Sequence, residues 1–112
     1  MPEFRQPSEA DPEAHGDGWQ VSVLADGRHI HGLAMVARRW TVQPGHRTPE
    51  RSHPGPDERF LYVISGRGSA LVGGEHLEVG PEDMIWLEPR DTFAFEAAEV
   101  PLHILDAASG SR

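Results

Sequence analysis

From Trp19 onward, short apolar and β-branched runs alternate with turn-forming residues. Within the runs, apolar and polar positions often alternate with a period of two, which is typical of half-buried strands. No segment shows a sustained helical spacing of apolar residues with caps. The expected strands cover residues 19–24, 29–42, 58–64, 69–72, 76–79, 84–87, 92–96 and 102–105. The pattern therefore predicts a nearly all-β chain.

Turn signals separate these runs at regular intervals. Asp26-Gly27, Ser65-Gly66 and Gly73-Gly74 are typical hairpin or turn dipeptides, and Pro44-Gly45 ends the second run. Spacings of about 8–12 residues between turns favour a sandwich or barrel. A chain of 112 residues is long enough for one such domain.

The first 18 residues have a different composition from the rest. They hold Pro2, Pro7 and Pro12, five acidic residues and few apolar ones. We expect a flexible acidic arm over residues 1–18, a barrel over 19–108 and a tail over 109–112. Phe4 is the residue most suited to anchor such an arm to a partner subunit.

Composition narrows the classes of function. The net charge is −8, which opposes nucleic acid as a partner because a duplex-binding protein presents a basic face to phosphate. No apolar run is long enough for a membrane span, and no signal peptide is visible. The chain has no cysteine, which excludes disulfides and thiolate sites and favours a cytoplasmic location.

Two motifs over residues 44–95 carry a resemblance to a known family. The first runs from Gly45 through Arg51-Ser52-His53 and Glu58 to Gly66. Its spacing resembles the first cupin motif, in which a Gly, a His-x-His pair, a Glu and a second Gly follow one another. Pro81-Glu82-Asp83 opens a much weaker version of the second cupin motif.

The resemblance implies a cupin jelly-roll barrel, whose usual metal is held by two His, a Glu and a third His. Here Arg51 takes the place of the first His, and His53 keeps the second. The place of the last His falls on Phe93 or, with a one-residue shift, on Ala94. A guanidinium has no lone pair for a cation and stays charged, so Arg51 cannot be a ligand.

The position of the motif's glutamate is open. Counting back from Gly66 gives Arg59, one residue after Glu58. A slip of one residue sends a strand side chain to the opposite face, whereas a β-bulge would keep Glu58 inside. On the second reading, His53 and Glu58 form an acid–base pair or the remainder of a metal site.

Other histidines provide a route to a rebuilt metal site. His29 and His31 are two residues apart on an expected strand, His46 precedes the first motif, and His103 is on the last strand. Taken singly, each is more typical of an exposed or hydrogen-bonded histidine. We expect no cofactor; the alternative is a divalent transition metal such as Mn, Fe, Ni or Zn.

Without the metal, the interior becomes a site for a small planar or anionic organic molecule. The candidate binding residues are Arg51, Arg59, Tyr62, Trp86, Phe93 and His46. The alternative for Arg51 and Arg59 is a structural ion-pair network with Asp57, Glu58 or Glu88. No nucleophile motif or phosphate-binding loop is present.

Three functions remain open on the sequence. The first is a metal-free cupin that binds a small molecule or performs acid–base catalysis, as in an isomerase or cyclase. The second is a metal-dependent enzyme such as a dioxygenase, using His53, Glu58 and recruited histidines. The third is an accessory or sensory barrel. The resemblance also implies a homodimer.

Overall fold

A computed structural model describes residues 4–6, 10–53 and 58–109 of the chain. Its secondary structure consists of strands and turns, so the prediction of an all-β chain is confirmed. The strands are β1 (Asp11–Gly16), β2 (Trp19–Ala25), β3 (Met35–Val42), β4 (Arg51–Ser52), β5 (Arg59–Ser65), β6 (Gly68–Val72), β7 (Glu75–Val79), β8 (Met84–Leu87), β9 (Thr92–Ala97) and β10 (Leu102–Ser109).

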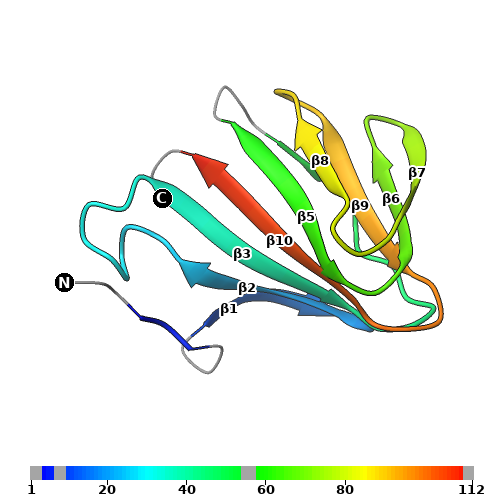
Figure 1. Ribbon diagram of the computed structural model, residues 1–112, viewed down its shortest axis with the longest axis horizontal. Helices are drawn as coiled ribbons and strands as arrows, with labels where there is room; N and C mark the ends of the chain where they lie inside the picture. The colour runs from blue at the N-terminus through cyan, green and yellow to red at the C-terminus, as the bar shows by residue number, and fades with distance from the viewer. Residues whose placement is uncertain (1–3, 7–9, 54–57, 110–112) are drawn as a thin grey trace.

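The strands form two antiparallel sheets that face each other (Figure 1). The large sheet has six strands in the order β1-β2-β3-β10-β5-β8, and the small sheet has four in the order β4-β9-β6-β7. The last strand, β10, pairs with both β3 and β5 in the middle of the large sheet. This crossing of distant segments is typical of a jelly roll.

The core lies between the sheets, because inward positions alternate with outward ones along each strand. On β3, Val36, Trp40 and Val42 are buried. Trp40 packs against Phe93 and Phe95 of the small sheet, with ring centroids 6.1 and 5.6 Å apart and edge-to-face geometry. Large aromatic side chains therefore fill much of the space between the sheets.

The largest differences from the sequence expectation lie in two segments. Residues 11–16, expected within the arm, form β1, which pairs with β2. Residues 26–34, expected partly as strand, are turns and bends, because β3 begins only at Met35. Among the described residues, no helix has the length and apolarity needed to cross a membrane.

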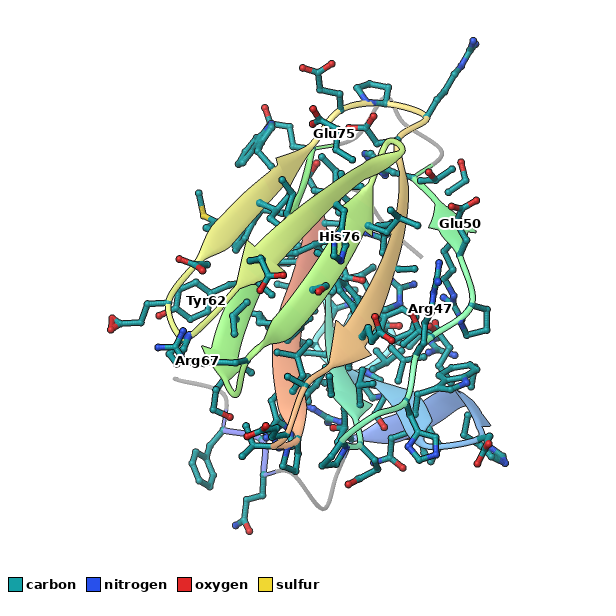
Figure 2. The ribbon with its side chains drawn as sticks, turned by 90° about the vertical axis from the view of Figure 1, so that its right-hand side faces the viewer. Arg47, Glu50, Tyr62, Arg67, Glu75 and His76 are labelled. Carbon is teal, nitrogen blue, oxygen red and sulfur yellow. The ribbon has the colours of Figure 1, made fainter. Side chains whose placement is uncertain are left out.

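The barrel has two ends, and one of them positions the candidate site. We call this end the mouth; it is formed by residues 26–34, β4, residues 88–91 and the turn at Gly73. The amide of Gly73 donates to the carbonyl of Thr92, which ties this turn to the start of β9. Figure 2 shows Glu75 at this end of the small sheet and Arg67 at the opposite end.

Candidate functional site

β4 and the residue after it bring two of the candidate side chains to the mouth. Arg51 pairs with Phe93 across β4 and β9. The amide of His53 donates to the carbonyl of Asp91 (2.8 Å), and the amide of Arg90 donates to the carbonyl of His53 (2.7 Å). These bonds fix the backbone of His53, which is 2% exposed. The structure thus places Arg51, His53 and Phe93 at one site.

Arg59 points into the barrel and forms a buried ion pair. Its Nε and Nη2 donate to the two carboxylate oxygens of Asp106 at 2.8 and 2.6 Å. The indole Nε1 of Trp40 donates to the same carboxylate at 3.0 Å. The guanidinium of Arg59 also lies 4.7 Å from the ring centroid of Phe93. Paired, hydrogen-bonded charges of this kind are the form in which buried charges are tolerated.

A second cluster lies nearer to solvent. Glu13 sits at a bulge in β1, between Pro12 and Ala14, where the register with β2 shifts. Its carboxylate accepts from Nε of Arg38 at 2.9 Å and lies 3.5 Å from Nη1 of Arg51. The guanidinium of Arg51 also lies 4.9 Å from the ring centroid of Trp40. A bulge is a common device for directing a side chain toward a site.

The arginines inside the barrel outnumber the carboxylates that they contact. Three guanidiniums, those of Arg38, Arg51 and Arg59, share the carboxylates of Glu13 and Asp106. Arg59 and Arg38 have the short contacts, so Arg51 is the least neutralised. The Arg51 side chain is 35% exposed, which leaves its guanidinium accessible from solvent.

The structure does not bring Glu58 to His53. Buried residues on β5 are Arg59, Leu61 and Val63, so Glu58 falls on the other face. Pairing of β5 with β10 is regular from Arg59 to Val63, and no bulge turns Glu58 inward. Glu58 lines a cavity on the outer face instead. This corrects the inward reading of Glu58, both as an acid–base partner of His53 and as a metal ligand.

Three further candidate residues lie away from the site. Tyr62 and Trp86 are on the outward positions of β5 and β8, and Trp86 is 54% exposed and stacks on Phe60. His46 accepts a bond from the amide of Ala97, at the opposite end of β9 from Phe93. Of the expected aromatic wall, only Phe93 is inside the barrel.

The expected ion-pair network of the arginines is present with other partners. The carboxylates are Asp106 and Glu13; Glu58 and Glu88 are exposed, and Asp57 lies outside the described residues. Sequence reasoning missed both partners because each is distant along the chain. The one signal in the sequence was Asp106 itself, because an acidic residue within an apolar strand indicates a buried cationic partner.

His29 and His31 are not a ligand pair on a strand, because both lie in the turns before β3. His29 contacts the carboxylates of Asp26 and Asp11. A hydrogen bond from Arg28 lowers the pKa of Asp26 to about 2. His103 faces outward, where its Nδ1 accepts from Nη2 of Arg39 at 3.1 Å.

The donor set at the mouth does not fit the metal that cupins usually hold. Two of the four ligand places carry guanidiniums, one carries a phenyl ring, and only His53 offers a lone pair. Within residues 4–6, 10–53 and 58–109, no three His, Asp or Glu side chains are grouped as a metal site. Positive charge at Arg51 and Arg59 would also repel a divalent cation at close range.

Solved structures similar to this fold include several cupin-type proteins. KdgF from Halomonas sp. has a TM-score of 0.78 at 20% identity, covering 100% of this chain and 96% of that one. A predicted oxalate decarboxylase from Thermotoga maritima has a TM-score of 0.79 at 17% identity, covering 96% of this chain and 99% of that one. The polyketide cyclase RemF from Streptomyces resistomycificus has a TM-score of 0.77 at 20% identity, covering 97% of this chain and 80% of that one.

At these identities the structural likeness shows the fold alone. No curated protein matches the sequence. The model of one family, the cupin domain, matches residues 38–107, which is more than half of the chain. This match spans β3 to β10, including the residues at the mouth. The resemblance to the cupin family is thereby confirmed, and the chain belongs to the cupin domain family.

Proposed function

We propose that this protein binds a small organic anion at the mouth of its barrel, without a metal ion. The observation that carries the proposal is Arg51, a partly exposed guanidinium that shares Glu13 with Arg38. A planar guanidinium binds carboxylates through two parallel hydrogen bonds, and a neighbouring aromatic ring suits a planar ligand.

The depth of the ligand follows from the packing. Trp40, Phe93 and Phe95 are each 1% exposed and fill the interior. Arg59 is committed to Asp106 by two hydrogen bonds. A ligand would therefore meet Arg51 at the rim, with the ligand's carboxylate directed inward and the rest of the molecule toward solvent. His53 lies beside this position as a second polar group.

Binding, rather than proton transfer, is the role that these residues support best. The expected acid–base partner of His53, Glu58, lies on the outer face of the barrel. Asp106, the buried carboxylate on the inner face, already accepts from Arg59 and Trp40. Asp106 therefore has surroundings that favour a structural role, and Glu58 is on the wrong face to act with His53.

Isothermal titration calorimetry with benzoate tests this proposal, because benzoate is planar and carries one carboxylate. We expect saturable binding to the wild-type protein and a loss of affinity in Arg51→Gln. Removing a charge-assisted hydrogen bond weakens binding by roughly tenfold to a hundredfold.

Arg47→Gln is the matched control, since Arg47 is an exposed arginine on the outer side of the barrel (Figure 2). Thermal unfolding of all three proteins verifies that each is folded. Equal affinity in Arg51→Gln and the wild type would overturn the assignment of Arg51, and no binding of benzoate to the wild type would count against a planar carboxylate ligand.

A further inference from the structure

The outer face of the large sheet carries a second cationic site. Along β2, β3 and β10, the side chains of Gln20, Arg39, Thr41 and His103 alternate with the buried core residues. In the pairing of these strands, Gln20 is opposite Thr41, and Thr41 is opposite His103. Arg38, the neighbour of Arg39, faces the barrel's interior, so the side chains of the two arginines lie on opposite faces of the sheet.

Arg39 differs from the other partly buried arginines in its partner. Arg38, Arg51 and Arg59 each pair with a carboxylate. The hydrogen bond recorded for Arg39 is to His103 Nδ1, at 3.1 Å, and within the described part of the chain no carboxylate lies within ion-pair distance of Arg39. In a chain with 18 acidic and 10 basic residues, a half-buried guanidinium without a carboxylate is unexpected.

The surroundings of the imidazole beside Arg39 favour its neutral form. Burial, and then the positive charge of Arg39, lower the pKa of His103. A neutral His103 accepts the Arg39 proton at Nδ1 and neutralises none of its charge. Thr41 Oγ1 lies 3.4 Å from the same nitrogen. The Arg39 guanidinium therefore keeps its full positive charge and is oriented by His103.

A cavity of about 400 Å³ opens over this charge. Its wall includes Arg39 and Thr41 from β3 and Gln20 and Ser22 from β2, and Arg5 and Gln6 of the N-terminal segment lie across it. Nε of Arg5 donates to the carbonyl of Leu24 at 2.8 Å, which fixes this segment beside β2. Figure 1 shows the segment along the β1–β2 side of the large sheet.

The chemistry of the wall selects the class of ligand. Its side chains offer guanidinium, amide and hydroxyl donors, and none of the lining residues that the structure describes carries a carboxylate. Such a wall suits an oxyanion and disfavours a metal cation. The volume admits a phosphate or a carboxylate of a few carbon atoms.

We propose that the cavity under the N-terminal segment is a binding site for a small oxyanion, phosphate or carboxylate, held by Arg39. It is distinct from the mouth site, since the large sheet separates the two, and it does not depend on the proposed function of the mouth. In this site Arg39 provides the charge, and Thr41 and Gln20 provide further hydrogen bonds.

Two titrations test the proposal and identify the anion: inorganic phosphate and acetate, each followed by NMR shifts of the backbone amides at a fixed ionic strength. We expect saturable shifts in β2 and β3 with one of the two anions. Arg39→Gln should weaken that binding by roughly tenfold or more, the effect of one charge-assisted hydrogen bond.

Arg47→Gln is the control, and it should retain the affinity of the wild type because Arg47 is exposed and lies outside both proposed sites. Arg39→Gln removes only a side chain on the outer face, so the amide spectrum of this variant should keep the dispersion of the folded protein. A second variant, His103→Gln, tests whether His103 orients Arg39. Shifts in β2 and β3 that grow linearly with both anions, binding that survives in Arg39→Gln, or binding that is lost in Arg47→Gln would each overturn the proposal.

Discussion

Arg59 and Asp106 form the most buried ion pair of the barrel, and their geometry explains why Arg59 can replace a metal ligand. Two parallel hydrogen bonds join guanidinium and carboxylate, and Trp40 adds a third to the carboxylate. The ring of Phe93 covers the guanidinium. Counting from Gly66 put Arg59 at an inward place, but its partner lies 47 residues away, which no local pattern reveals.

Substitution of Asp106 tests this pair. Asp106→Asn removes the charge that balances Arg59, and leaving a buried guanidinium unpaired costs about 3–5 kcal/mol. We expect the free energy of unfolding, measured with urea, to fall by that amount. The exposed Glu99→Gln is the control and should change it little. A loss as small in Asp106→Asn as in the control would mean that the pair is not buried in solution.

His103 predicts how stability depends on pH. Its pKa is lowered in the folded protein by burial and by Arg39, so the unfolded chain binds the proton more readily. The contribution of His103 to the free energy of unfolding is therefore fully present above about pH 6.5, the ordinary pKa of histidine. It is lost as the pH decreases from there through the lowered pKa of the folded protein. His103→Gln should flatten this decline, measured as urea midpoints at about pH 7.5 and about pH 5.5. The exposed His76→Gln should keep the decline of the wild type, and an unchanged decline in both variants would contradict the assignment to His103.

At the scale of elements, the sequence predicted the positions of the strands better than it predicted which strands pair. The expected runs at 84–87 and 92–96 coincide closely with β8 and β9, because their apolar and β-branched residues suit a pleated surface. β1 was missed because Asp11–Gly16 shows no apolar alternation, and it forms by pairing with β2. Tyr62 and Trp86 were expected inside, yet alternation along β5 and β8 directs both outward.

β1 supplies the carboxylate that partly neutralises the mouth, which leads to a prediction. Glu13→Gln keeps the size of the side chain and removes its charge, leaving Arg38 and Arg51 without the Glu13 carboxylate. Affinity for benzoate, measured by calorimetry, should rise several-fold because the ligand no longer competes with Glu13. Glu99→Gln should leave it unchanged. A weaker affinity in Glu13→Gln would show that Glu13 helps the ligand rather than competing with it.

At the scale of the whole molecule, the cupin barrel was predictable from turn spacing and the first motif, whereas its chemistry was not. The resemblance implied a ligand set of histidines and a glutamate inside the barrel, and here guanidiniums and a phenyl ring lie at those places. The homodimer implied by the family stays a prediction, which light scattering can check. Met84 and Trp86, exposed on the outer face of β8, are side chains that an interface would cover.

Elemental analysis of the untagged protein, after dialysis against Mn, Fe, Ni and Zn and removal of unbound ions, tests the central claim most directly. With one imidazole and two guanidiniums at the ligand places, we predict no stoichiometric transition metal in the wild type. One metal ion per chain that is lost in His53→Ala, with the fold retained, would contradict the account and favour a metal-dependent cupin.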